Sequence, residues 1–147
     1  DRNIVKIARD GNDHTILTVD GAEFKDIAPV YYGQLQLGDQ VYIFGSAGEY
    51  DRVYRQGTVS KFLPAIPPFM AALTGKRPRP AAILFDINGY FGDSGAAVFN
   101  DKGQVVALIS YVNAQTKHFD SEDIDTSMKL MGAFVLQFTE DQLHTVK

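Results

Sequence analysis

Cysteine is absent from the 147 residues of this chain. A disulfide framework, a thiolate metal site and a cysteine nucleophile are therefore excluded. Long apolar runs are missing as well, because no stretch approaches the roughly 20 apolar residues that a membrane-spanning helix needs. The first residues lack the basic and apolar regions of a signal peptide. We expect no membrane span and no targeting segment, and the sequence leaves the compartment open.

Positive charge is also scarce. The formal net charge is -4 and the isoelectric point is about 5.2, whereas a phosphate-binding domain normally gathers an excess of lysine and arginine on one face. Acidic residues cluster at Asp120, Glu122, Asp123 and Asp125, but without the glycine and terminal glutamate spacing of an EF-hand. This favours a solvated acidic loop, and we expect no nucleic-acid partner, no metal ion and no cofactor.

Short apolar runs separated by turn residues make up most of the chain. Residues 4–7 are followed by the turn sequence 10–13, which predicts a hairpin whose second arm covers residues 15–19. Repeated short strands with turn signals between them are typical of an all-β barrel or sandwich. Further strands are expected at residues 40–44, 57–62, 83–87, 96–99, 105–112 and 134–138.

Two segments depart from this strand pattern. Five of the six prolines fall between Pro64 and Pro80, which excludes a continuous helix or a central strand there. The apolar middle of this loop, residues 69–73, is expected to form a helical turn or two and to pack on the body of the protein. The alternative is a lid beside an active site. After the last strand, Thr139 and Gln142 predict a capping box that starts a terminal helix.

The strongest chemical signal is a serine between two glycines, Gly92-Asp93-Ser94-Gly95. A serine hydroxyl is a poor nucleophile until a tight loop exposes the oxygen and points nearby amides toward one spot. The two glycines permit such a loop. The same four residues are also ordinary turn composition, so a plain β-turn is the alternative interpretation.

Beyond these four residues, the turn lies between two apolar strands, and the second of them is followed by a turn at 101–103 and the strand at 105–112. In this extended pattern the sequence resembles the trypsin-like serine peptidases, and among them the bacterial HtrA-like and related disulfide-free members. In that family a Gly-Asp/Asn-Ser-Gly turn carries the nucleophile, and a Val-x-Gly-Ile-x-Ser-like strand lines the substrate cleft. Residues 106–110 match this strand with Ala107 in the glycine's place.

Matches to the same family continue far from the serine, at residues 1–7, 37–45, 57–60 and 131–135. Only the proline-rich loop and residues 113–130 fall outside the resemblance. It implies an all-β fold in which residues 35–147 form the second antiparallel six-stranded barrel of a chymotrypsin-like double barrel, with a C-terminal helix. Residues 1–34 would be the end of the first barrel and the connector between the barrels.

The resemblance also assigns roles at the reaction centre. Ser94 would be the nucleophile, and the amides of Gly92 and Ser94, with that of Asp93, would form the oxyanion hole. Asp1 would orient the catalytic histidine. At Ala96 and Ala97 relatives often have Gly-Pro, so the chain departs from the family pattern directly after the turn.

Substrate contacts are implied at two places. Asn88, six residues before Ser94, would occupy the base of the pocket that selects the side chain preceding the cleaved bond. Because Asn88 is uncharged, a preference for lysine or arginine is not expected. Ser110, Tyr111 and Val112 would contact the substrate from the strand that lines the cleft. Val112, where many relatives carry glycine, would narrow the pocket mouth and favour small or medium apolar side chains.

The general base is missing from this pattern. In the family the order along the chain is histidine, aspartate, serine, so the histidine should precede Asp1, and we expect His14, His118 and His144 to be surface residues. The resemblance implies a serine endopeptidase, present as a fragment, with a polypeptide substrate and a missing N-terminal barrel that carries the histidine as its partners. The alternative is a non-catalytic binding or structural module with the same fold.

Overall fold

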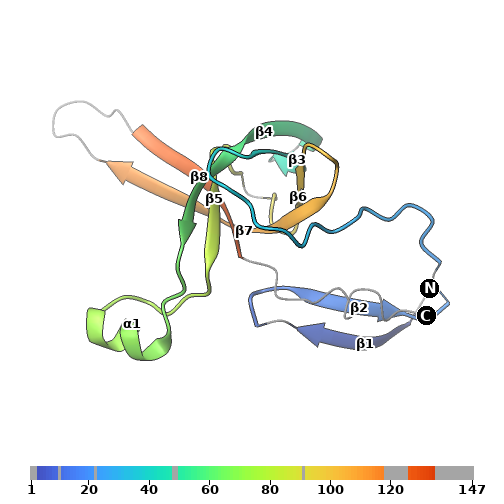
Figure 1. Ribbon diagram of the computed structural model, residues 1–147, viewed down its shortest axis with the longest axis horizontal. Coiled ribbons are helices and arrows are strands. Elements are labelled where there is room, and N and C mark those ends of the chain that lie inside the picture. The colour runs from blue at the N-terminus through green and yellow to red at the C-terminus, as the bar shows by residue number, and fades with distance from the viewer. Residues whose placement is uncertain are drawn as a thin grey trace.

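The computed structural model describes residues 3–9, 11–21, 23–47, 50–90, 92–117 and 126–134, and Figure 1 shows how their elements are arranged. Strands β1 (Ile4–Arg9) and β2 (Thr15–Val19) pair as an antiparallel hairpin. Six further strands close into an antiparallel barrel in the order β3-β4-β5-β8-β7-β6. The barrel strands are β3 (Gln40–Ala47), β4 (Tyr50–Leu63), β5 (Ala82–Phe85), β6 (Ala97–Asn100), β7 (Val105–Lys117) and β8 (Thr126–Phe134).

The barrel closes between β3 and β6, where Val41 pairs with Asn100 and Ile43 with Val98. Successive side chains of a strand point to opposite faces, so Val41 and Ile43 point inward while Tyr42 and Phe44 lie outside. The core consists of apolar side chains from all six strands and from Ile87, which follows β5. Its members are Val41, Ile43, Val59, Ile83, Phe85, Ile87, Val98, Val106, Ala107, Ile109, Met131 and Ala133. The expected all-β fold with a six-stranded antiparallel barrel is confirmed.

A connector joins the hairpin to the barrel along the first residue of β7. The Tyr31 amide donates to the Val105 carbonyl at 2.8 Å, and the Val105 amide donates to the Pro29 carbonyl at 2.8 Å. These bonds form a parallel bridge between Val30 and Val105. The connector is thereby fixed to this side of the barrel by its own backbone.

His14 lies at the end of the hairpin and corrects one expectation from the sequence. The turn before it contains Asp13, whose φ of 71° is in the left-handed region. His14 is only 4% exposed, and it lines a cavity of about 630 Å³ together with residues of β2, the connector and the barrel. Leu35 and Val106 are among the apolar residues on the other side of that cavity. His14 is therefore not a surface residue.

Several strands extend farther than the sequence pattern indicated. β4 begins at Tyr50 rather than at residue 57, and β7 continues to Lys117. β8 begins at Thr126 and shares only Phe134 with the strand expected at 134–138, whose other residues lie outside the described part of the chain. β7 and β8 remain paired up to Lys117 and Thr126 and project from the barrel as a long hairpin (Figure 1). Continued pairing satisfies backbone donors and acceptors, which a sequence pattern without apolar alternation does not reveal. The expected terminal helix at 140–146 and acidic loop at 120–125 lie outside the described residues.

Helix α1 (Pro68–Thr74) occupies the middle of the proline-rich loop. Figure 1 shows it at the end of an arm made by β4 and β5, away from the barrel. The expected helical turns are present, but the expectation that they pack on the body is wrong. Pro64 lies just after β4 and Pro80 just before β5. These prolines and the extended pairing of β4 with β5 direct the loop away from the barrel. In the described part of the chain, no helix is long and apolar enough to cross a bilayer.

Candidate active site

Ser94 lies on a tight turn between β5 and β6. The turn depends on Gly92 and Gly95, whose φ angles of 105° and 86° are in the left-handed region that favours glycine. The Ala96 amide donates to the Asp93 carbonyl at 2.9 Å and closes the turn. Ser94 is exposed at this position, and within the described residues the amides of Gly92 and Ser94 donate to no protein acceptor.

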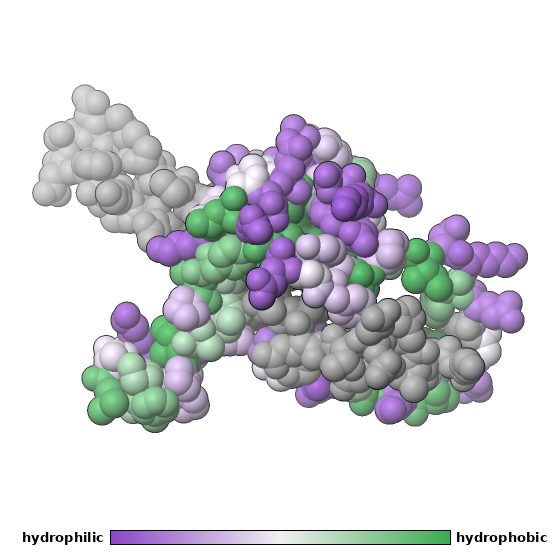
Figure 2. Space-filling model, viewed as in Figure 1, coloured by the Kyte–Doolittle hydropathy of each residue, from purple (hydrophilic) through white to green (hydrophobic). Residues whose placement is uncertain are grey.

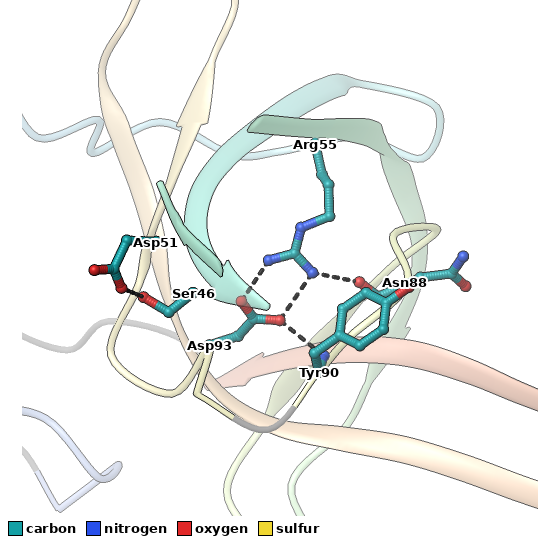
Figure 3. Close-up of polar contacts among 6 residues, drawn as sticks. All are labelled: Ser46, Asp51, Arg55, Asn88, Tyr90 and Asp93. Atoms are coloured by element: carbon teal, nitrogen blue, oxygen red, sulfur yellow. Dashed lines mark hydrogen bonds and ion pairs between the residues drawn. The ribbon is translucent and has the colours of Figure 1, made fainter. Parts of the chain in front are cut away.

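Asp93, directly before the serine, is only 1% exposed. A buried carboxylate needs a charged or hydrogen-bonding partner to offset its lost hydration. Arg55 of β4 provides it through both terminal nitrogens: Nη1 lies 2.8 Å from Asp93 Oδ2, and Nη2 contacts Oδ1. The pair is thus bidentate, the strong geometry for arginine and carboxylate. Figure 3 shows the Arg55 guanidinium pointing from β4 toward the Asp93 carboxylate.

The same two side chains also hold the loop that precedes the serine. Arg55 Nη1 donates to the Asn88 carbonyl at 2.7 Å, and the Tyr90 amide donates to Asp93 Oδ2 at 2.8 Å. The Arg55 guanidinium lies 5.3 Å from the centroid of the Tyr90 ring, within the range of a cation–π contact. One buried ion pair therefore fixes the path of the backbone from Asn88 to the serine (Figure 3).

Sequence reasoning missed Arg55. The only available signal was that an aspartate buried beside a glycine turn requires a cation, and the chain offers 14 lysines and arginines. Arg55 and Asp93 are 38 positions apart in sequence. Arg55 becomes the partner of Asp93 only because the closed barrel brings β4 next to the serine turn.

Two glycines leave space for this arrangement. A Cβ on Gly45, at the end of β3, would overlap Asp93 Oδ1 and lie 2.5 Å from Arg55 Nη2. A Cβ on Gly92 would lie 2.7 Å from the Ser46 carbonyl oxygen, closer than a carbon and an oxygen can approach without a clash. The serine turn therefore packs directly against the backbone of β3, and neither position accepts a side chain without movement.

The turn is tied to β7 by a pair of backbone hydrogen bonds. The Gly95 amide donates to the Ile109 carbonyl at 2.7 Å, and the Ile109 amide donates to the Ala96 carbonyl at 2.9 Å. Ser110, which follows Ile109, is half-buried at a register shift where Ile109 pairs with Ala133 and Tyr111 with Gly132. Ser94 and Ser110 thus flank the same hydrogen-bonded contact between the turn and β7.

Residues 2–108 match the family model of the trypsin-like peptidase domain. The chain belongs to this family. The match includes the hairpin, the connector, the serine turn and the start of β7. A comparison with curated proteins gives no match. Membership supports a peptidase and therefore a hydrolase.

As in other trypsin-like peptidase domains, the residues around the serine turn are candidates for substrate contacts. Asn88 is exposed, and in Figure 3 its side chain points away from Arg55. It lines a hollow of about 620 Å³ together with Tyr50, Asp86 and Tyr90. The backbone of Tyr111 and Val112 pairs with Gly132 and Met131 of β8. The specificity roles of Asn88, Ser110, Tyr111 and Val112 stay predictions.

The remaining site assignments divide into three groups. Asp1, His118 and His144 lie outside the described residues, so the role of Asp1 as the orienting aspartate stays a prediction. His14 lines the cavity beside the connector, and Ser94 is not one of the lining residues of that cavity. Asp93 has a different part from the one expected: its amide donates to the Tyr90 carbonyl at 3.2 Å, so it is already engaged inside the turn.

Proposed function

We propose that the protein is a serine endopeptidase in which Ser94 is the nucleophile. The observation that carries the proposal is the contrast within the turn: Ser94 is exposed, while Asp93 beside it is buried and paired with Arg55. An exposed hydroxyl on a backbone that cannot relax is what a nucleophile requires. The Ser94 Oγ would attack the peptide carbonyl, expel the amine and leave an acyl-enzyme that water then hydrolyses.

The oxyanion formed by this attack would be stabilised by two backbone amides, those of Gly92 and Ser94. Both are without a protein acceptor in the described part of the chain, and donors already in place stabilise the developing charge without reorganisation. The ion pair of Asp93 and Arg55 supports this role because it prevents the turn from rotating its amides away. We omit the Asp93 amide from the hole because Tyr90 already accepts its hydrogen bond.

A histidine must accept the Ser94 proton and pass it to the leaving amine. We propose that this histidine belongs to a first barrel and that Asp1 fixes its tautomer. The β1–β2 hairpin supports the presence of such a partner, because Ile4, Val5, Ile7 and Leu17 are all exposed apolar side chains. Exposed apolar residues gathered on a small sheet mark a surface that is normally covered. The polypeptide substrate would lie along the strand that contains Ser110.

The second candidate is a non-catalytic binding or structural module. It is favoured by the position of His14, the only histidine of the described residues, which lines the cavity at the connector rather than the serine turn. The two candidates differ in one property that is open to experiment. An enzyme activates Ser94 toward electrophiles, whereas a module leaves it with the reactivity of an ordinary serine.

The test is labelling of a protein that contains this chain together with the proposed first barrel, with a fluorophosphonate probe. We expect the probe to modify Ser94, as mapped by mass spectrometry, and Ser94→Ala to lose both labelling and peptide cleavage. The matched control is Ser60→Ala, which removes a hydroxyl from an exposed position of β4 and should change neither. Absence of labelling in a folded longer protein would support the module instead.

A further inference from the structure

The tip of the β4–β5 arm presents an apolar face that the described residues leave exposed. Phe69, Met70 and Leu73 of α1 are 66%, 40% and 78% exposed. Residues three and four apart lie on the same side of a helix, so these three side chains form one patch. Figure 2 shows hydrophobic atoms on the separate lobe that α1 forms at the end of the arm. We call this patch the arm tip.

The arm holds the tip in a defined place. The pairing of β4 with β5 reaches Leu63 and Ala82, and it continues beyond them in a bridge between Ile66 and Arg79 with hydrogen bonds of 2.8 and 3.0 Å. Pro67 begins the helix, and Gly75, with a φ of 65°, ends it. The apolar patch is thus displayed by a hydrogen-bonded support and is not part of an irregular loop.

Charge around the arm tip is opposite to the charge of the rest of the chain. Every charged residue from Lys61 to Phe85 is basic, namely Lys61, Lys76, Arg77 and Arg79, although the whole chain has a net charge of -4. Lys76 and Arg77 follow the helix directly and are exposed. Lys61 is exposed on the supporting strand. The apolar patch therefore has a basic collar within an otherwise acidic protein.

An apolar patch with a basic collar fits an anionic lipid surface. Peripheral membrane binding uses apolar side chains inserted into the bilayer interface and attraction between lysine or arginine and acidic headgroups. Each contribution alone gives weak binding, and the two together give stable binding. The tip is convex and small, whereas a stable protein interface buries about 1,200–2,000 Å² in total. A bilayer needs no matching pocket to receive three side chains. The acidic remainder of the chain is repelled by the same surface, which orients the tip toward it.

We propose that the arm tip docks the protein peripherally on an anionic lipid bilayer, with Phe69, Met70 and Leu73 entering the interface and Lys76 and Arg77 contacting acidic headgroups. Ser94 and its turn take no part in this contact. The inference is independent of whether the protein is a peptidase or a non-catalytic module.

Co-sedimentation of the 147-residue chain with unilamellar vesicles tests the proposal. We expect binding to phosphatidylcholine vesicles that contain phosphatidylserine, weakening with added salt, and no binding to phosphatidylcholine alone. Phe69→Ser with Leu73→Ser should weaken binding about tenfold or more, because the apolar contribution is lost. Lys76→Glu with Arg77→Glu should weaken binding by about as much, because headgroup attraction becomes repulsion.

Matched controls remove similar side chains elsewhere. Phe24→Ser with Ile27→Ser alters two exposed apolar residues of the connector, and Lys25→Glu with Lys102→Glu reverses two exposed charges. Both should bind as the unaltered chain does. Unchanged circular dichroism checks that every variant folds, which is expected since the substituted side chains are on the surface.

Three results would overturn the proposal. One is failure of the folded chain to bind the anionic vesicles, and another is equal binding by the arm-tip variants and the controls. The third is displacement from vesicles by soluble polyglutamate together with no effect of Phe69→Ser and Leu73→Ser, which would indicate an acidic protein segment as the occupant.

Discussion

Asp93 and Ser94 are adjacent in the chain, yet one is buried and the other exposed. Burying the Asp93 carboxylate and the Arg55 guanidinium costs hydration that their attraction only partly repays, so the pair is a poor means of gaining stability. The pair matters more for the geometry of the turn, because Asp93 also accepts a hydrogen bond from the Tyr90 amide and Arg55 also donates one to the Asn88 carbonyl. We interpret the pair as the device that positions the turn for Ser94.

The residue-scale prediction concerns this pair. Arg55→Ala should lower the free energy of unfolding by roughly 3–5 kcal/mol, because it leaves the buried Asp93 carboxylate uncompensated. Asp93→Ala should cost less, because the Arg55 side chain it leaves unpaired is partly exposed. The double variant should cost clearly less than the sum of the two, since it removes both charges. Urea denaturation of all four proteins measures the coupling.

Arg55→Lys is the matched control for the geometry of the pair. It keeps the positive charge and loses the bidentate contact, so its effect should be intermediate. Additive costs for Arg55→Ala and Asp93→Ala would contradict the role given to the pair and would indicate that the two residues act separately.

At the scale of elements, the approach of β4 to the segment after β5 depends on Gly57. A Cβ at this position would overlap the Asp86 carbonyl oxygen and lie 2.6 Å from the Ile87 side chain. The Asp86 amide donates to the Thr58 carbonyl at 2.9 Å, so the two segments cannot separate without losing a hydrogen bond. Asp86 and Ile87 begin the chain segment that leads to Ser94.

Gly57→Ala should therefore destabilise the barrel by about 1–3 kcal/mol, the usual cost of forcing an added methyl into a packed site. Ser60→Ala on the same strand is the control and should stay within about 0.5 kcal/mol of the unaltered chain, because its side chain is exposed. Thermal or urea unfolding measures both. If Gly57→Ala were as stable as Ser60→Ala, the close contact with Asp86 would not govern this part of the barrel.

The sequence predicted which elements exist better than where they end. Short apolar runs bounded by turn residues at 40–44 and 105–112 located strands correctly, because such runs supply the side chains that enter the core. The outer parts of β4, β7 and β8 were not predicted, because they are recognised only from their backbone pairing with a neighbouring strand, which reaches Tyr50, Lys117 and Thr126. The helical turns of the proline-rich loop were predicted, but their position away from the barrel was not.

At the scale of the whole molecule, the barrel holds the nucleophile candidate while the hairpin leaves apolar residues exposed. The described residues bring no histidine to the serine turn, because His14 lies at the connector cavity. Activation of Ser94 thus depends on a group from outside these elements. This separation predicts how the chain behaves on its own.

The 147-residue chain alone should show no peptidase turnover. A serine without its base loses catalysis on the order of 10⁶-fold in comparable cases, so casein and fluorogenic peptides should stay intact and a fluorophosphonate should react at the rate of an ordinary serine. Ser94→Ala is the control, and it should be indistinguishable from the unaltered chain in both assays. Cleavage that Ser94→Ala abolished would show that a base lies within these residues and would direct attention to His118 and His144.

By itself, the sequence determined the class of the fold and the place of the serine turn. Strand-length apolar runs can bury their side chains only in a sheet that closes on itself or packs on another, and Gly92 and Gly95 supply the two left-handed positions that expose Ser94. The tertiary structure alone decided the partner of Asp93, the burial of His14 and the display of the arm tip. These features depend on contacts between residues far apart in the chain, such as Arg55 and Asp93, or on the absence of such contacts around α1. Local pattern carries no information about them, because any of many basic residues could have met the aspartate until the barrel closed.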